Sequence, residues 1–232
     1  MRLAVVSGGT RGIGLALSRR LTKLGFEVVA LYRSDAAAAA AAEASGLRTY
    51  QVDVADPDAV AVVADKIGPI SVLVNNAGVN IDRPFLEMSV QDWKTVVDTN
   101  LSGAFYLTRA FVPMMDDGTV INVGATTGMR ARANGANYCA AKAGLLHLTK
   151  CLALELAPKI RVNCLIPGMT ETDELVTRFR LDDPVARAQV ISEIPVGRMG
   201  TVEDVADGLE FLVNGTYVTG QKLIVDGGQW MW

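Results

Sequence analysis

Short apolar runs alternate with longer amphipathic segments along the whole chain. The short runs are rich in Val, Ile and Leu and are bounded by Gly, Asn or Asp, which predicts buried strands. The segments between them repeat apolar residues every three or four positions, which predicts helices. The expected strands cover residues 3–7, 27–31, 48–52, 71–74, 119–123, 161–166 and 223–225.

Strict alternation of strands and helices predicts an α/β fold, a Rossmann-type doubly wound parallel sheet of about seven strands with helices on both faces. Half of the residues are hydrophobic, which is enough to cover both faces of such a sheet. A length of 232 residues without a linker or repeat predicts a single domain, residues 1–232. Residues 169–194 are more polar and only irregularly helical, and we expect them to form a mobile lid.

Composition excludes several classes of partner. Lys and Arg total 22 against 25 Asp and Glu, so neither a nucleic acid nor a membrane surface is expected. No apolar run approaches the length of a membrane span, and the first residues begin a strand without the anatomy of a signal peptide. The three cysteines are widely spaced, which is typical of reduced thiols in a cytoplasmic protein. With a single histidine, His147 in a helical pattern, no metal site is expected.

A glycine-rich turn follows the first strand and opens the first helix. Gly8, Gly12 and Gly14 would let backbone N–H groups approach a pyrophosphate at the positive end of that helix. The spacing differs from G-x-G-x-x-G, and a purely structural turn is the alternative. The position after a strand and before a helix favours a dinucleotide site.

The end of the second strand indicates which dinucleotide. This position normally faces the adenosine ribose, where an acidic residue favours NAD and an Arg favours NADP. Here Arg33 lies at the strand end and Arg11 lies in the glycine turn, so two guanidiniums could bind one phosphate. We therefore expect NADPH or NADP, while Asp35, two residues further on, leaves NAD as the alternative.

Tyr138 and Lys142 are four residues apart in a segment with helical periodicity. That spacing places them on one face, where an ammonium would lower the pKa of the phenol and create a general acid–base pair. From spacing alone, a solvent-exposed Tyr and Lys is the alternative. Asn100 lies inside a long helical pattern, residues 89–115, where a buried Asn indicates a kink or a bound water.

Taken together, these motifs resemble the short-chain dehydrogenase/reductase family over essentially the whole chain. The resemblance rests on the glycine turn, Asp53, residues 75–78 (Asn-Asn-Ala-Gly), Asn100, the Tyr138–Lys142 pair, Pro167-Gly168 and Asp226-Gly227-Gly228. Residues 10–14, 137–144 and 195–200 are similar to those of 3-oxoacyl-(acyl-carrier-protein) reductases and their acetoacetyl-CoA and polyketide ketoreductase relatives.

The resemblance implies an oxidoreductase that uses NADPH to reduce a ketone. Tyr138 would donate the proton, Lys142 would bind the nicotinamide ribose and lower the pKa of Tyr138, and Asn100 would hold a water that relays protons. The cofactor-binding residues it implies are Gly8, Thr10, Arg11, Gly12, Ile13, Gly14, Arg33, Asp53, Val54, Asn76, Ala77, Gly78, Tyr138, Lys142, Pro167, Gly168 and Thr170.

One catalytic position departs from the family pattern. A serine expected thirteen residues before the tyrosine would orient the substrate carbonyl, but Ala125 stands there and has no donor. Three readings are open: an engineered Ser-to-Ala change, a natural variant in which Thr126 or another loop group donates, and a member that binds the cofactor without reductase activity. The first two imply NADPH binding with weak ketone reduction.

The resemblance also implies substrates and assembly. A 3-oxoacyl thioester or a polyketide-like carbonyl would be presented by acyl carrier protein or coenzyme A, in fatty acid or polyketide metabolism. Arg130 and Arg132 could contact such a carrier or could be solvated loop charges. Family members usually form homotetramers through two long helices and the last strand, which would bury Leu145, Leu146, Leu148, Leu152 and the tail Trp230-Met231-Trp232.

Overall fold

The computed structural model describes residues 2–231, so Trp232 of the expected apolar tail lies outside the described part. Within those residues, seven parallel strands form one sheet in the order β3-β2-β1-β4-β5-β6-β7. This confirms the predicted doubly wound fold. The strands are β1 (Leu3–Ser7), β2 (Glu27–Tyr32), β3 (Arg48–Gln51), β4 (Val72–Asn75), β5 (Gly118–Val123), β6 (Ile160–Pro167) and β7 (Lys222–Val225).

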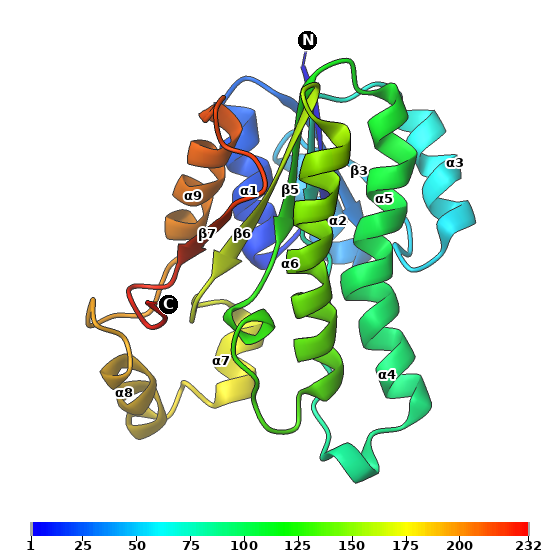
Figure 1. The fold of residues 1–232 in the computed structure, drawn as a ribbon. Helices are drawn as coiled ribbons and strands as arrows, with labels where there is room; N and C mark the ends of the chain where they lie inside the picture. The colour runs from blue at the N-terminus through cyan, green and yellow to red at the C-terminus, as the bar shows by residue number, and fades with distance from the viewer. Residues whose placement is uncertain (1, 232) are drawn as a thin grey trace.

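Helices cover both faces of this sheet (Figure 1). Leu17 and Leu209 pack α1 and α9 on one face, while Phe111 and Val63 pack α5 and α3 on the other. None of the helices in residues 2–231 is long and apolar enough to cross a membrane. The helices are α1 (Gly12–Lys23), α2 (Ala36–Ala44), α3 (Pro57–Ile67), α4 (Val90–Val97), α5 (Gly103–Phe111), α6 (Ala136–Leu156), α7 (Asp173–Phe179), α8 (Pro184–Ser192) and α9 (Val202–Asn214).

Side-chain caps explain where several of these helices begin. Asp56 accepts hydrogen bonds from the backbone of Asp58 and Ala59 at the start of α3. Thr201 and Asp204 form a reciprocal capping box at the start of α9. These local interactions determine where both helices begin.

The long helix expected over residues 89–115 is interrupted. A π-helical turn, Asp98–Ser102, separates α4 from α5. Inside it the side-chain amide of Asn100 donates to the backbone oxygens of Val96 (2.8 Å) and Val79 (2.7 Å). The kink that Asn100 indicated is therefore present, and its physical cause is the competition of the side chain for backbone acceptors.

Two further expectations concern the apolar residues of the expected interface and the lid, residues 169–194. Leu145 is only 1% exposed and belongs to the interior of the single chain, so it cannot contribute to an interface between copies. The segment 169–194 contains α7 and α8, which pack on a small apolar core of their own around Leu181, Ile194 and Met199. Its mobility remains a prediction.

Candidate active site

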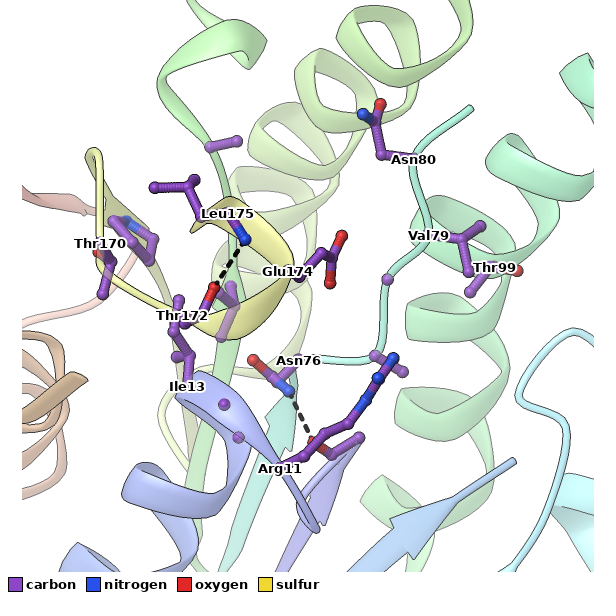
Figure 2. A pocket seen from close by; sticks show the side chains of 18 of the residues that line it. Arg11, Ile13, Asn76, Val79, Asn80, Thr99, Thr170, Thr172, Glu174 and Leu175 are labelled. Atoms are coloured by element: carbon purple, nitrogen blue, oxygen red, sulfur yellow. Dashed lines mark hydrogen bonds between the residues drawn. The ribbon is translucent and has the colours of Figure 1, made fainter. Parts of the chain in front are cut away.

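A cavity of about 550 Å³ lies where the carboxyl ends of β1, β4 and β5 meet α6 and α7 (Figure 2). This is the crevice where open parallel α/β sheets bind their ligands, because the strand order reverses there. All of the expected cofactor-binding residues line this cavity, and so does Ala125. Asn100 does not line it, whereas the adjacent Thr99 does.

The glycine turn has the geometry of an anion cradle. Gly8 and Gly12 have φ angles of +63° and +52°, which side chains rarely adopt. A Cβ on Gly14 would lie 2.0 Å from the backbone oxygen of Gly8, so only glycine permits this tight approach. Asn76 donates its side-chain amide to the backbone oxygens of Ser7 (3.0 Å) and Gly8 (3.2 Å) and ties the end of β4 to the turn. The turn therefore presents the start of α1 to the cavity.

Two arginines border the cavity at the end of β2. Arg11 and Arg33 both line it, and neither has an ion-pair partner within residues 2–231. Asp35 lines it too, but its carboxylate caps α2 by accepting from the backbone of Ala38 (3.0 Å). The two guanidinium groups are better suited to bind a 2′-phosphate on the ribose than the uncharged 2′- and 3′-hydroxyls.

Tyr138 and Lys142 lie one turn apart on α6, with the Lys142 Nζ atom 5.6 Å from the centre of the Tyr138 ring. Lys142 is 4% exposed, and its ammonium donates to the backbone oxygen of Val123 at 2.8 Å. Burial lowers the pKa of Lys142 to about 8 and raises the pKa of Tyr138 to about 12. The expected lowering of the Tyr138 pKa by Lys142 is therefore wrong for this structure, because desolvation of the phenolate dominates.

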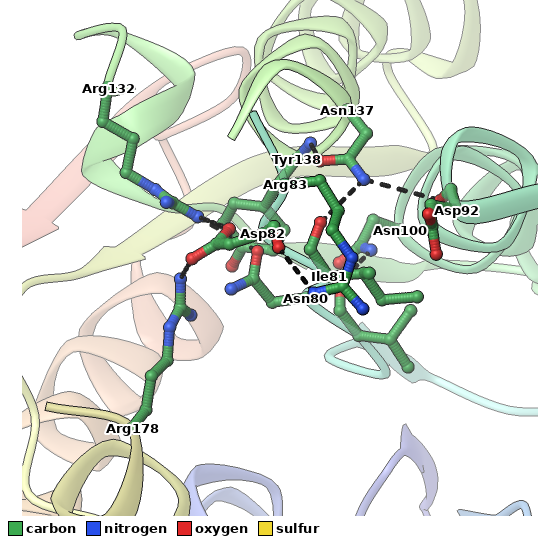
Figure 3. A network of polar contacts seen from close by, with 11 residues as sticks. Asn80, Ile81, Asp82, Arg83, Asp92, Asn100, Arg132, Asn137, Tyr138 and Arg178 are labelled. Carbon is green, nitrogen blue, oxygen red and sulfur yellow. Dashed lines mark hydrogen bonds and ion pairs between the residues drawn. The ribbon is translucent and has the colours of Figure 1, made fainter. Parts of the chain in front are cut away.

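Two other cations face Tyr138. The positive charges of Arg178 and Arg132 lower its pKa, whereas the charge of Glu174 raises it. The Arg132 Cζ atom lies 5.9 Å from the ring centre, and both guanidiniums pair with Asp82 (Figure 3). No sequence signal pointed to Asp82 or Arg178, since they are far apart in the chain and belong to no motif.

Asn100 has one atom without a partner. Its Oδ1 is buried and accepts no hydrogen bond from any group in residues 2–231, and a Cβ on Gly78 would lie 2.8 Å from it. Gly78 therefore leaves the space into which this oxygen projects. A buried, unpaired amide oxygen is suited to accept from a water molecule.

The loop after β5 contains the missing serine position. Ala125 adopts an extended conformation and accepts from the backbone of Gly128 (2.9 Å), which begins a short 3₁₀ turn, Thr126–Gly128. Thr126 and Thr127 both line the cavity. The Thr127 hydroxyl is buried and has no hydrogen-bond partner in the described chain. The sequence left the substitute donor open between Thr126 and another group of this loop, and Thr127 is the loop residue whose buried hydroxyl is unpaired within residues 2–231.

Comparison with known proteins agrees with the fold. The family described as enoyl-(acyl carrier protein) reductase matches residues 8–229. The chain is 36% identical to the 3-oxoacyl-(acyl-carrier-protein) reductase FabG of Escherichia coli over 99% of this chain and 98% of that protein. It is 41% identical to an acetoacetyl-CoA reductase of Paracoccus denitrificans over 98% of both chains.

Solved structures are similar as well. A blue fluorescent protein from a metagenomic library, in complex with NADPH, has a TM-score of 0.88 at 33% identity and covers 99% of this chain and 98% of that chain. Thermoplasma acidophilum aldohexose dehydrogenase has a TM-score of 0.91 at 29% identity, with coverage of 98% and 93%. The chain belongs to the short-chain dehydrogenase/reductase family, a family of oxidoreductases. The two relatives from Escherichia coli and Paracoccus denitrificans are both named as reductases.

Proposed function

We propose that this protein is an NADP(H)-dependent ketone reductase acting on 3-oxoacyl thioesters. The observation that carries the proposal is the convergence of the Tyr138–Lys142 pair, the glycine turn and the two unpaired arginines on one cavity. The relatives named as 3-oxoacyl and acetoacetyl-CoA reductases support the substrate class. A neighbour solved with NADPH supports the cofactor.

The cavity residues divide the binding of the cofactor between them. The backbone of the glycine turn and the start of α1 would hold the pyrophosphate, and Arg11 and Arg33 would hold the 2′-phosphate. Asp53 and Val54 would border the adenine, and Pro167, Gly168 and Thr170 would border the nicotinamide. When bound, NADPH supplies the hydride.

The protein supplies the proton and the charge. A Tyr138 pKa of about 12 keeps the phenol protonated at neutral pH, as a proton donor to the carbonyl oxygen must be. Lys142 would bind the cofactor's ribose and bring positive charge to the site, and the unpaired Asn100 oxygen would hold the water of a proton relay. Ala125 offers no donor to the carbonyl, and losing one such donor costs about 2.7–4 kcal/mol, or roughly 10²–10³ in rate.

The test is a cofactor-oxidation screen of 3-oxoacyl thioesters and simple ketones with the unsubstituted chain, Ala125→Ser and Ala125→Ser/Tyr138→Phe. We expect slow turnover with NADPH, a rise in kcat of about tenfold or more in the serine variant, and loss of that gain in the double variant. NADH should support less activity than NADPH. Absence of turnover by Ala125→Ser with every carbonyl would reject the reductase proposal.

A second candidate function is cofactor binding without turnover, and the alanine at position 125 is the observation that favours it. The fluorescence of NADPH on mixing separates the two candidates from a protein that does not bind the nucleotide. NADPH binding by a chain that stays inactive after Ala125→Ser would favour this second function.

The resemblance to the family extends the proposal to assembly and to the carrier of the substrate. A homotetramer remains our proposal, and the half-exposed Phe105 on α5 and the exposed Leu154 on α6 support it as apolar surface on the two long helices. Light scattering measures the assembly. A substrate presented by acyl carrier protein is tested by comparing carrier-bound and coenzyme A thioesters in the same screen.

A further inference from the structure

An ion-pair network outside the expected site joins three segments at the mouth of the cavity (Figure 3). Asp82 follows β4, Arg132 lies in the loop before α6, and Arg178 lies on α7. One carboxylate oxygen of Asp82 accepts from Arg132 at 2.5 Å, and the other accepts from Arg178. All three side chains are only 29–31% exposed, so these pairs are less screened than ordinary surface pairs.

The network has one fixed side and one lid side. On the fixed side, Asn137 donates to the backbone oxygen of Ile81 (2.9 Å), and the backbone of Arg83 donates to Asn134 (2.8 Å). On the lid side, Arg178–Asp82 is the only hydrogen bond or ion pair in residues 2–231 that joins α7 to a residue outside residues 169–200.

The start of α7 lies near the glycine turn, away from the Arg178–Asp82 pair. Thr172, the capping residue of α7, lies beside the glycine turn, since a Cβ on Gly12 would be 3.7 Å from its methyl group. The helix lines the cavity with Glu174 and Leu175 (Figure 2). Arg178, one turn further along the helix, lines it as well. It therefore spans the cavity from the glycine turn to Asp82.

We propose that Asp82, Arg132 and Arg178 form an ionic latch that docks α7 over the cavity and holds two guanidiniums beside the ring of Tyr138. Asp82 is thus a positioning residue for the proton donor, and this catalytic half of the inference rests on the proposed function. Gly135 permits the arrangement, because a Cβ there would lie 2.7 Å from the Arg132 Cζ atom.

The latch predicts the direction in which the Tyr138 pKa changes when Asp82 is replaced. The charged or titratable groups facing Tyr138 are Arg132, Arg178 and Glu174, together with Lys142 and Cys139 of its own helix. Removing only the negative charge of Asp82 would lower the Tyr138 pKa. Losing the position of both guanidiniums would raise it, since their charges lower it in the latched state.

The first test needs no catalytic activity. Hydrogen exchange of the α7 amides is compared in the unsubstituted chain, Asp82→Asn, Arg178→Gln and Arg180→Gln. Loss of these charge-assisted bonds should speed α7 exchange about tenfold in the first two variants. Arg180→Gln removes the same charge from the exposed end of the helix and should leave the exchange unchanged. Unchanged α7 exchange in a folded Asp82→Asn protein would overturn the latch.

The second test follows the reverse reaction, alcohol oxidation, in the Ala125→Ser background. Asp82→Asn and Gly135→Ala should move the rising limb of the pH profile to higher pH, and Asp82→Glu should restore most of the natural profile. A shift to lower pH, or no shift, contradicts the positioning role. If no variant turns over any substrate, the proposed function fails while the exchange experiment still decides the latch.

Discussion

At the scale of single residues, burial decides the protonation of the central pair. Tyr138 and Lys142 are neighbours on α6, yet the pKa of the phenol is raised to about 12 and that of the ammonium is lowered to about 8. Both shifts favour the neutral form, as desolvation always does. Spacing identified the two residues, but the packing around them decided their charge.

Thr127 is the residue we expect to compensate in part for Ala125. Thr127 lines the cavity, and its hydroxyl has no hydrogen-bond partner within residues 2–231, so it can donate to a bound carbonyl without breaking an existing hydrogen bond. Thr127→Val should lower the residual kcat of the chain that carries Ala125 roughly 10²-fold. In the Ala125→Ser background the same change should matter little.

The control for this prediction is Thr126→Val, measured in both backgrounds by steady-state kinetics. If Thr127→Val lowers kcat equally in the chain with Ala125 and in the Ala125→Ser background, Thr127 affects activity through packing and not as a donor. The unfolding of Thr127→Val serves as a second check, because replacing an unsatisfied buried hydroxyl by a methyl should not destabilise the fold.

At the scale of elements, local sequence signals were reliable wherever the interaction itself is local. Asp56 and Thr201 set the starts of α3 and α9, because a capping side chain bonds to backbone two or three residues away. The helical pattern over residues 89–115 is present, but a π-helical turn at Asn100 divides it. The Asn100 amide bonds to Val79, far back in the chain, and periodicity carries no information about such a partner.

The cap of α9 leads to a pH-dependent prediction. Two hydrogen bonds from Arg198 and those from Thr201 hold the pKa of Asp204 well below its usual range. A depressed carboxyl pKa stabilises the fold above the unfolded-state pKa, and this stability is lost as pH falls below about 4. Asp204→Asn should therefore lower the free energy of unfolding at neutral pH by about 1 kcal/mol and flatten its decline in acid.

Denaturant unfolding at several pH values between neutral and acid measures this effect. Asp182→Asn, an exposed carboxylate on the lid, is the matched control and should leave the pH dependence unchanged. If the free energy of unfolding of Asp204→Asn falls in acid as steeply as that of the unsubstituted chain, protonation of Asp204 is not the cause of the acid destabilisation.

At the scale of the whole molecule, the site is maintained at a cost in stability. The sheet and α6 enclose Lys142 so completely that charging it opposes folding. The unfolded chain binds more protons than the folded chain between the folded pKa of about 8 and the ordinary value of 10.5. Stability associated with Lys142 therefore rises with pH across that window, and the full cost applies below it.

Lys142→Met should therefore stabilise the fold at neutral pH while abolishing the proposed activity. We expect the free energy of unfolding to increase by about 1–3 kcal/mol, less than the full pKa shift because Val123 loses its hydrogen-bond donor. The gain should shrink as the pH rises through 10.5, the ordinary lysine pKa. Above that pH, Lys142 is uncharged in the unfolded chain too, so folding no longer requires it to lose a proton. Destabilisation at neutral pH, or a gain independent of pH, would contradict this account.

By itself, the sequence determined the order of strands and helices and many of the residues that line the cavity. Apolar runs, glycines and capping residues act through their immediate neighbours, and parallel strands bring their carboxyl ends to one edge. The turn at Gly8, the arginines at positions 11 and 33 and the Tyr138–Lys142 pair were therefore recognisable before any packing was known.

Only the tertiary structure decided how that cavity is closed and charged. Asp82 lies 50 residues from Arg132 and 96 from Arg178, and no local pattern relates them. The unpaired hydroxyl of Thr127 and the burial of Lys142 likewise depend on which surfaces meet across the sheet. Desolvation and ion pairing are properties of an enclosed volume, so they exist only once the chain has folded around it.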